Sequence, residues 1–542
     1  MRIARSMKQD DGLESALLAR VAACNFDATI LDTNDLSTIR GSSLIALRFP
    51  ERIVQRLERE RPDLQVSAIA SGASELLFRF ASLPGATEAV EAALRRTLRG
   101  AGDPASWPWT LFTYVWAVEG PDDGAGRDFV KRLRRLTARC NTLQYRQPTI
   151  VLPPFHSDAE RRARDGKTDA ASVVCSLDGV RPATPGLRQK SKAVSASVRW
   201  RRGFGVKAKE LFYEAELKDI GYRSALPFAG EFSDLAPTAD ERRTRDIPDS
   251  LTGKMALIYL DGNGFGQRRQ AEGRTAAGLR AFSEDVKAKR RDLLHEVLTA
   301  LDDLPGMIHP GDERTRQCVR FETLLWGGDE VMWALPACCA WAVMGVVQAH
   351  LNDRNRWGEL THAAGLLIAP YKAPITHLTA LVKDLGDTAK TVNRGGNGVQ
   401  IGIVSGFDMP GVTVDALRRP LFDPDGAEDE VPHGTLQCDG ARWGDGQGAM
   451  AAVKHPRTGL PRSALYRVYH ESLEKGLFAS GRREDARRYL DMGLAQIELV
   501  HEGTIDPQAI ATLRDGLPGA QGVAEHPLVP LHQILSLWDI AR

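Results

Sequence analysis

The chain has 542 residues with 71 Lys+Arg and 70 Asp+Glu, so its formal net charge is +1. Because 26% of the residues are charged and 43% are hydrophobic, the composition excludes a mostly disordered chain. The balanced charge also excludes a globally basic, histone-like nucleic-acid binder. At roughly 100–200 residues per domain, we expect three or four domains, each with its own core.

The first third of the chain has the pattern strand, helix, hairpin, helix, strand, helix. The predicted elements are a strand at 26–31, a helix at 43–59, a hairpin of 65–69 with 76–80, a helix at 87–99, a strand at 110–118 and a helix at 128–140. The hairpin turn is Ser71-Gly72-Ala73-Ser74. Alternating apolar residues in the strands and helical spacing between them indicate an α+β unit.

The same order recurs between residues 255 and 404. The predicted elements are a strand at 255–260, a helix at 275–301, a hairpin of 321–326 with 331–335, a helix at 336–351, a strand at 363–369, a helix at 375–390 and a strand at 399–404. After residue 411 the chain is predicted to be loop-rich at 423–448 and then helical at 462–477, 483–501, 506–515 and 531–541.

Two short sequence matches relate the halves. The segment 30–34 (ILDTN) matches 259–263 (YLDGN), and 71–75 (SGASE) matches 326–330 (WGGDE). The gap from the aspartate to the hairpin is 42 residues in the first copy and 68 in the second, so the second would carry a longer insertion. We interpret this as duplication of a βαββα unit. The alternative is two α+β domains that share common turn chemistry.

The segment between the copies, about 151–245, is locally basic. Residues 181–209 contain nine Lys/Arg and no acidic residue, with Trp200 and Phe204 among them, a pattern that could follow a phosphate backbone. The candidate nucleic-acid contacts are Arg199, Arg201, Arg202 and Lys207. The alternative is a solvated linker or an edge hairpin.

Three acidic residues of the second half are predicted to converge. Asp261 follows an apolar strand and is followed by glycines at 262, 264 and 266, which would let the backbone pass close to a phosphate. Asp329 and Glu330 lie in the turn between two apolar strands. If this hairpin lies beside the first strand, the carboxylates of Asp261 and Asp329 meet, with Glu330 nearby.

Such a cluster favours a divalent metal site. Three unpaired carboxylates repel one another, and a bound cation removes that cost. Hard oxygen ligands select Mg²⁺ or Mn²⁺, and two such ions stabilise the attacking and leaving oxygens of an in-line phosphoryl displacement. The predicted metal ligands and catalytic residues are Asp261, Asp329 and Glu330. Taken alone, GGDE is also an ordinary hairpin turn.

Glycines and lysines near these acids are predicted to bind the nucleotide. A side chain at Gly327 or Gly328 would block it, and the turn needs a positive φ. Lys390, at a helix end, could reach a triphosphate, although a cation there also suits a helix C-terminus. The predicted nucleotide-binding residues are Gly262, Asn263, Gly264, Phe265, Gly327, Gly328, Lys372 and Lys390.

The first copy lacks this chemistry. Its Asp32 and Glu75 remain, but Ser74 stands where the second copy has Asp329, and a hydroxyl cannot replace a carboxylate that bridges cations. We therefore expect the first copy to be a binding or scaffolding half, with Asp32 and Glu75 as polar contacts.

These motifs resemble the palm domains of the large subunit of type III CRISPR effector complexes, a relative of the GGDEF cyclases. The resemblance rests on YLDGNGFG (259–266), LLWGGDEVMWALP (324–336), GLLIAPYKAPITHL (365–378) and GNGVQIGIV (396–404), and in the first copy on DLSTIRGSSLI (35–45) and ASGASELLF (70–78). VCSLDGVRPAT (174–184) resembles the zinc segment between the palms, and LPRSALYRVYH (460–470) resembles the start of the C-terminal helical domain.

The resemblance implies an α+β fold with two tandem ferredoxin-like palms. The expected domains are a degenerate first palm at 1–150, a basic inter-palm segment at 151–245, a catalytic second palm at 246–410 and a mainly helical domain at 411–542. It also implies that the protein joins ATP into cyclic oligoadenylates for antiviral defence. The implied partners are RNA, small RNA-binding subunits and a downstream effector that senses the cyclic product.

The sequence departs from the family pattern at several points. The usual GGDD is GGDE here, Asn263 stands at an often acidic position, and no His-Asp doublet of a metal nuclease occurs. The inter-palm segment keeps Cys175 but not four ligands, so we expect no structural zinc. The alternatives are a cyclic dinucleotide synthase or short-primer polymerase, and a non-catalytic RNA-binding scaffold subunit.

The expected location is the cytoplasm. The seven cysteines are scattered without a CxxC pair, which indicates reduced thiols, and charges within residues 2–14 leave no apolar core for a signal peptide. The uncharged run 331–347 reaches the lower limit for a membrane span, but Pro336 divides it. We interpret it as a buried strand followed by a helix, and expect no membrane partner.

Overall fold

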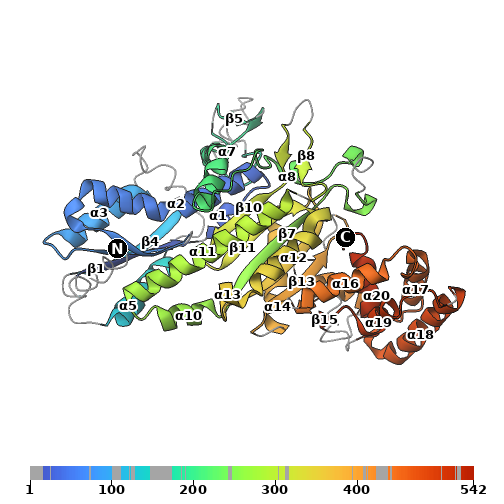
Figure 1. The fold of residues 1–542 in the computed structure, drawn as a ribbon. Coiled ribbons are helices and arrows are strands. Elements are labelled where there is room, and N and C mark those ends of the chain that lie inside the picture. Colours follow the sequence, from blue (N-terminus) through green and yellow to red (C-terminus); the bar gives the residue numbers. More distant parts are fainter. Residues whose placement is uncertain are drawn as a thin grey trace. The chain divides into compact units, whose positions relative to one another are not determined.

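Figure 1 shows the structure, a computed structural model. The chain divides into two compact units. The first comprises 1–219, 265–290 and 324–328, and the second 220–264, 291–323 and 329–542. The residues that the structure describes are 16–24, 26–72, 75–99, 112–120, 123, 128–146, 174–184, 186–189, 191–241, 247–302, 304–311, 316–392, 395–406, 411, 413–422, 437–439, 442–501, 503–518, 520–521 and 526–541.

The first unit is built on a four-stranded antiparallel sheet with the order β2-β3-β1-β4. Its strands are β1 (Leu17–Cys24), β2 (Ser67–Ser71), β3 (Glu75–Phe80) and β4 (Thr113–Val118). Its helices are α1 (Phe26–Ile30), α2 (Leu36–Glu60), the short η3 (Pro62–Leu64), α3 (Ala86–Arg99) and α5 (Phe129–Tyr145). The chain order β1-α2-β2-β3-α3-β4 and this strand order are those of a ferredoxin-like unit.

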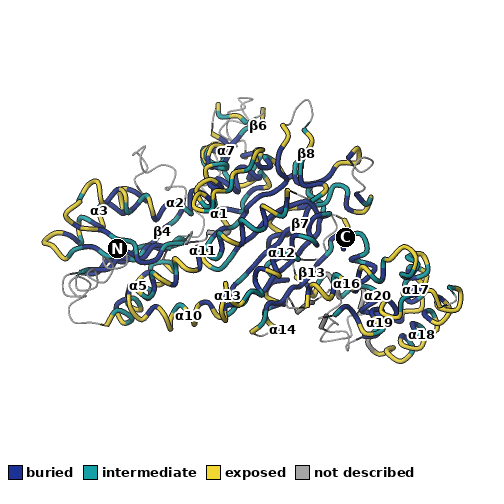
Figure 2. Tube along the Cα trace, in the orientation of Figure 1, coloured by how far each residue is buried: buried dark blue, intermediate teal, exposed yellow. Residues whose placement is uncertain are grey.

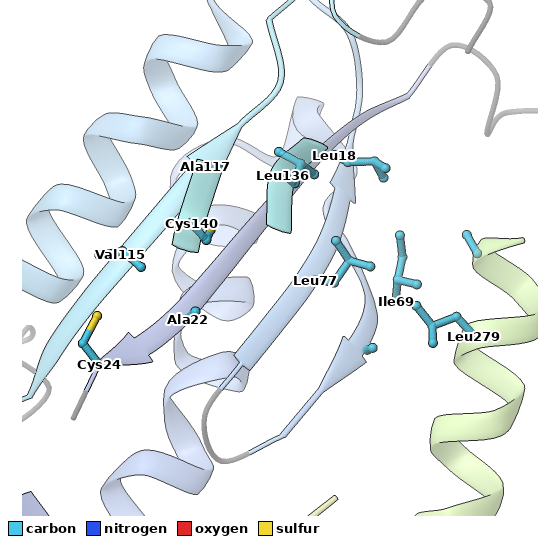
Figure 3. Packing of buried hydrophobic residues seen from close by; sticks show 12 residues of the cluster. Leu18, Ala22, Cys24, Ile69, Leu77, Val115, Ala117, Leu136, Cys140 and Leu279 are labelled. Atoms are coloured by element: carbon cyan, nitrogen blue, oxygen red, sulfur yellow. The ribbon is translucent and has the colours of Figure 1, made fainter. Parts of the chain in front are cut away.

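A later part of the chain completes the core of this sheet. Leu136 and Cys140 of α5 pack on β1 and β4, while Leu279 of α11 (Ala276–Leu301) packs beside Ile69 of β2 (Figure 3). From the same helix, Arg280 Nη2 donates to the Ser67 hydroxyl at 2.8 Å and to a β2 carbonyl. Helix α11 thus covers the edge strand β2, whose unpaired backbone groups would otherwise be exposed.

Residues 188–217 form a small hairpin and a long helix, and the helix packs against α2 of the first unit. The hairpin is β5 (Arg188–Gln189) with β6 (Lys192–Ala193), and the helix is α7 (Ala196–Leu217), capped by Ser195. Helices α2 and α7 approach so closely that glycine is required on both of them. A Cβ on Gly41 would lie 1.7 Å from the Arg201 carbonyl oxygen, and a Cβ on Gly205 would lie 2.0 Å from the Ser37 carbonyl oxygen. The local pattern did not predict this helix.

A seven-stranded sheet, with the order β10-β11-β7-β12-β13-β14-β15, forms the centre of the second half. Its strands are β7 (Lys254–Asn263), β10 (Glu322–Gly327), β11 (Glu330–Pro336), β12 (Thr361–Pro370), β13 (Gly398–Ile403), β14 (Gln437–Asp439) and β15 (Ala520–Gln521). β7 is antiparallel to β11 and β12, and β13 is parallel to β12. Met255–Leu260 is buried along its whole length (Figure 2), as expected for a central strand.

Helices and short elements complete the chain. Those before and around the sheet are α8 (Phe232–Leu235), η6 (Asp249–Leu251), α10 (Phe265–Glu272), β8 (Ile308–His309), β9 (Cys318–Val319), η7 (Ala337–Cys339), α12 (Ala340–Leu351), α13 (Arg354–Trp357), α14 (Ile375–Val392) and α15 (Val414–Phe422). The C-terminal group is α16 (Trp443–Val453), α17 (Arg462–Glu474), η9 (Ser480–Arg482), α18 (Arg483–Val500), α19 (Pro507–Asp515) and α20 (Val529–Leu537). Across the described residues, no helix is long and apolar enough to cross a membrane.

The predicted α+β class is confirmed, and most predicted elements lie within a few residues of the observed ones. One prediction is wrong: residues 26–30 are helical, and the first strand is Leu17–Cys24. Both segments are apolar and short, so periodicity alone could not separate them. The division of 331–347 into a buried strand and a helix is confirmed by β11 and α12.

Candidate active site

Strand register brings two of the predicted acids together. β11 pairs with β7 antiparallel from Pro336–Met255 to Val331–Leu260, so the next step of the ladder sets Glu330 beside Asp261. Tyr259 lies two residues before Asp261 and therefore on the same face of β7. Its hydroxyl donates a hydrogen bond to Glu330 Oε1 at 3.1 Å. The two carboxylates thus share one end of the central strand pair.

Helix α14 packs closely on this face because two glycines meet there. Gly365 of β12 pairs with Tyr259, and a Cβ on Gly365 would lie 2.2 Å from the Val382 carbonyl oxygen. A Cβ on Gly386 would lie 2.9 Å from the Tyr259 ring. Only glycine permits this approach, and it brings the charged residues of α14 over the end of β7.

Three charged residues of α14 belong to the site. Lys383, Asp387 and Lys390 have spacings of four and three, so they share one face of the helix. Lys390 Nζ donates to Asp261 Oδ2 at 2.6 Å and to the Gly262 carbonyl at 3.2 Å. The Lys383 ammonium lies 5.9 Å from the centre of the Tyr259 ring. Lys390 was predicted from the sequence, whereas Lys383 and Asp387 were not, although their helical spacing was a usable signal.

The ionisation of these groups is coupled. Burial raises the pKa of Glu330, and the charges of Asp261 and Asp329 raise it further, while Lys383 and the Tyr259 hydrogen bond oppose the shift. Burial also raises the pKa of Asp387, with Asp261 adding to the rise. The pKa of Tyr259 is raised by burial and then by Glu330 and Asp261, so its hydroxyl keeps its proton. These carboxylates are therefore close enough to disfavour one another's charge.

The donor set at this end of the sheet suits a hard divalent cation. Asp261 and Glu330 supply neighbouring carboxylates, and the Asn263 side-chain oxygen is buried without a hydrogen-bond partner in the part of the chain that the structure describes. However, no group of three or more His, Cys, Asp or Glu among the described residues is arranged to hold a metal. The predicted three-carboxylate centre is thus not assembled here, and Lys390 neutralises Asp261 instead.

The predicted turn glycines have the expected backbone. Gly328 has φ +52° at the first central position of the β10–β11 turn, as a type II′ turn requires. Gly264 has φ +69° directly before α10. Phe265 is buried and packs edge-on against Phe282 with ring centroids 6.3 Å apart, so it serves the core of the first unit. Gly327 is the last residue of β10.

The prediction that Lys372 contacts a nucleotide at this site is wrong. β12 runs antiparallel to β7, with Ala363 beside Asp261 and Pro370 beside Lys254. Lys372 therefore lies beyond the opposite end of the sheet, about 23 Å of strand away from Asp261. The short Pro-Tyr-Lys-Ala-Pro sequence gave no information about which strand end it follows.

The proposed sequence match between Asp32 and Asp261 is also wrong. The β1–β3 register sets Ala22 beside Glu75, so Ala22 holds the strand position that Asp261 holds in β7. Asp32 follows helix α1, where Arg201 Nη1 donates to Asp32 Oδ1 at 2.9 Å and Arg181 pairs with the same carboxylate.

Glu75 is likewise an ion-pair residue. Its carboxylate pairs with Arg20 at 3.0 Å and with Arg269 of α10. Both Asp32 and Glu75 are therefore polar contacts, as expected of a half without the metal chemistry. Ser74, predicted to stand in place of Asp329, lies outside the described residues.

Most of the candidate nucleic-acid residues are engaged within the protein. Arg201 is fully buried, and Arg202 Nε donates to Asp35 Oδ2 at 3.2 Å, so these two predicted contacts are corrected to structural roles. Arg199 donates to the Gln189 side chain at 2.8 Å but remains exposed. Lys207 and the neighbouring Trp200 are exposed on α7.

Solved structures of Csm1 are similar to this chain in fold. No family model and no curated protein matches the chain. A structure of a Csm1–Csm4 cassette in complex with cA4 matches with a TM-score of 0.54 and 13% identity, over 98% of this chain and 70% of that chain. Csm1 from T. onnurineus matches with a TM-score of 0.54 and 13% identity, over 97% and 70%.

The chain has the fold of Csm1. A further Csm1–Csm4 cassette, solved in complex with AMPPNP, matches with a TM-score of 0.52 and 12% identity, over 98% of this chain and 70% of that chain. Csm1 is the palm-domain large subunit of type III CRISPR-Csm, so the resemblance seen in the sequence motifs agrees with the similarity of fold. The similarity extends along nearly all of the chain and is not limited to one domain.

Proposed function

We propose that the protein is a nucleotidyltransferase that joins ATP into cyclic oligonucleotides of the cyclic oligoadenylate type. The observation that carries the proposal is the Asp261–Glu330 pair at the end of β7 and β11, flanked by Lys383 and Lys390. The Csm1 fold supports it, because structures of that fold were solved with AMPPNP and with cA4.

Each side chain has a role in this proposal. Asp261 and Glu330, with Asp329 from the same turn, would hold Mg²⁺ or Mn²⁺, which when bound stabilises the charge of phosphoryl transfer. Tyr259 holds Glu330 in place through its hydroxyl. Lys390 would leave Asp261 and bind the triphosphate as a point charge, while Gly262, Asn263, Gly264, Gly327 and Gly328 leave room for the nucleotide.

The proposed organisation is a pair of tandem palms. The degenerate first palm at 1–150 and the inter-palm segment at 151–245 would carry regulation, the second palm at 246–410 would carry catalysis, and 411–542 would be the helical domain. The matching strand orders β2-β3-β1-β4 and β10-β11-β7-β12 support this division. RNA and small RNA-binding subunits are the proposed activators, and an effector that senses the product is the proposed downstream partner.

The test is product formation from ATP with Mg²⁺, analysed by mass spectrometry with and without target RNA. We expect cyclic oligoadenylate from the parent protein. Asp261→Asn and Asp329→Ala should each lower the yield by about 100-fold or more. Lys372→Ala is the matched control and should leave the yield unchanged, because Lys372 lies at the other end of the sheet.

The alternatives give different results in the same assay. A cyclic dinucleotide product or a linear primer would identify the related enzymes that use the same metals. If the parent makes no product and binds no nucleotide in the presence of Mg²⁺, the non-catalytic scaffold function is correct. Equal yields from the parent and Asp329→Ala would show that the site is wrongly assigned.

A further inference from the structure

Three helices, α2, α7 and α11, contact the β10–β11 hairpin at or near its turn. The Ser43 hydroxyl of α2 donates to the Leu324 carbonyl oxygen at 2.8 Å. The ring of Phe212, from α7, meets Trp326 edge-on with centroids 5.8 Å apart. The third contact comes from Arg290 of α11, and all of these residues lie in the first compact unit.

Arg290 makes two different contacts with this tip. Its guanidinium carbon lies 4.3 Å from the centre of the Trp326 ring, and Nη1 donates to the Gly328 carbonyl oxygen at 2.9 Å. Arg290 and Trp326 are 5% and 4% exposed. Burying a guanidinium is costly, so its retention here needs a reason. The planar guanidinium of arginine can stack on a ring and, at the same time, donate a hydrogen bond in the plane of the guanidinium. A lysine ammonium is a compact point charge and cannot make both contacts in this way.

The contacted carbonyl belongs to the residue directly before Asp329. Gly328 has a left-handed backbone and no side chain, so nothing of its own fixes the plane of the Gly328–Asp329 peptide. A hydrogen bond to its carbonyl restricts that plane. Since this peptide ends at Asp329, its orientation affects where the Asp329 carboxylate projects, next to Glu330 at the start of β11.

We propose that Arg290 is a positioning residue that fixes the turn at Gly328 and Asp329, and that the contacts from Phe212 to Trp326 and from Trp326 to Arg290 connect this turn to helix α7. The proposal rests on the proposed function for its catalytic consequence. It adds that the geometry of the acids is set from the inter-palm helix, whose outer face exposes Trp200 and Lys207. A ligand that moves α7 would act on the turn through Phe212.

The first test measures the turn itself, without reference to activity. Amide hydrogen exchange is followed by mass spectrometry in the full-length protein for peptides covering 324–331, with peptides from 254–260 as an internal reference. Arg290→Lys and Arg290→Met should raise exchange in the turn at least about tenfold and leave the reference unchanged. Arg280→Lys, on the same helix but bonded to β2, is the control and should exchange like the parent. Unchanged exchange in both Arg290 variants would overturn the proposal.

The second test separates positioning from folding. With protein concentration corrected by the folded fraction, Arg290→Lys should lower kcat for ATP by about 100-fold while KM changes little, because the acids are misplaced but the nucleotide still binds. Mn²⁺ binding without ATP, followed by electron paramagnetic resonance, should weaken in parallel. A parental kcat and Mn²⁺ affinity per folded molecule would overturn the positioning role. An inactive parent would refute the proposed function, whereas the exchange measurement would still decide the role of Arg290.

Discussion

At the scale of single residues, the two halves differ in the residue at one strand position. In the second sheet the residue beside Glu330 is Asp261, whereas in the first sheet the residue beside Glu75 is Ala22. Without a neighbouring acid, Glu75 binds two arginines and forms ordinary ion pairs. The carboxylate of Glu330, in contrast, is half-buried and lies near other acids, which is the arrangement expected of a functional group.

The ionised form of Glu330 therefore destabilises the folded protein. Burial and the charges of Asp261 and Asp329 raise its pKa, so a neutral side chain of the same size relieves repulsion. We expect Glu330→Gln to have an unfolding temperature equal to or above that of the parent, while Mg²⁺-dependent turnover falls about 100-fold or more. Calorimetry and the ATP assay measure the two effects. A clear loss of stability would contradict this account of the site.

At the scale of elements, the site depends on how closely α14 approaches the sheet. The alanine methyl group of Gly365→Ala would meet the Val382 carbonyl oxygen at 2.2 Å, and backbone cannot move aside as a side chain can. We expect Gly365→Ala to destabilise the protein by about 1–3 kcal/mol. Turnover should also fall, because Lys390 and Asp387 move away from Asp261. Urea unfolding and the ATP assay test this.

Gly448→Ala is the matched control for that substitution. Gly448 is exposed within α16, and a Cβ there would meet nothing within 4 Å. Alanine has the higher helix propensity, so this variant should be more stable than the parent by about 0.5–1 kcal/mol, with unchanged turnover. Equal effects of the two substitutions would mean that the close packing of α14 is not what stabilises the site.

Helix α7 carries both a buried arginine with structural contacts and exposed basic residues. Arg201 is fully buried and pairs with Asp32, so Arg201→Ala leaves a buried carboxylate with less compensation and should destabilise the first unit by about 3–5 kcal/mol. Lys207→Ala should leave stability unchanged, because Lys207 is exposed. If α7 contacts RNA, Lys207→Ala lowers RNA affinity at low salt and reduces the salt dependence. Fluorescence-monitored unfolding and filter binding separate the two variants.

At the scale of the whole molecule, buried histidines predict an acid limit to stability. Burial lowers the pKa of His526 from 6.5 to about 4 and that of His362 to about 3. Below pH 6.5 these histidines bind protons in the unfolded chain but remain neutral in the folded protein. Their effect on the free energy of unfolding is therefore small above pH 6.5, and the protein loses stability as the pH decreases towards the folded pKa values. Each of the two histidines should lower the free energy of unfolding by about 2 kcal/mol between pH 6.5 and pH 5.

Urea unfolding at both pH values measures the loss. His526→Asn is the control, because the asparagine side chain can still accept the hydrogen bond that the Leu528 amide donates to His526 Nδ1 at 3.2 Å, but does not titrate. This variant should lose about 2 kcal/mol less than the parent on acidification. An identical pH dependence in the variant would show that His526 does not titrate as its burial implies.

Local patterns in the sequence determined the elements and the identity of the acids. Strands alternate with a period of two and helices with a period near 3.6, so β7, β11, β12 and α14 could be predicted within a few residues of their observed bounds. The Asp-Gly-Asn-Gly and Gly-Gly-Asp-Glu segments also identified Asp261 and Glu330, because a carboxylate at a strand end or in a glycine turn is a local feature. The five-residue helix α1 at 26–30, predicted as a strand, shows where such patterns fail, since short apolar runs suit either structure.

Only the tertiary structure decided which of these groups meet. The β7–β11 register joins Asp261 to Glu330, the glycine contact brings Lys383, Asp387 and Lys390 over them, and the α2–α7 crossing buries Arg201. Each of these contacts joins residues far apart in the sequence, and no local period or spacing shows which partners meet. The local sequence of a basic run, of a lysine near a proline or of an aspartate after an apolar segment is the same whichever neighbours it has in the folded protein. The chemistry of such residues therefore depends on tertiary packing.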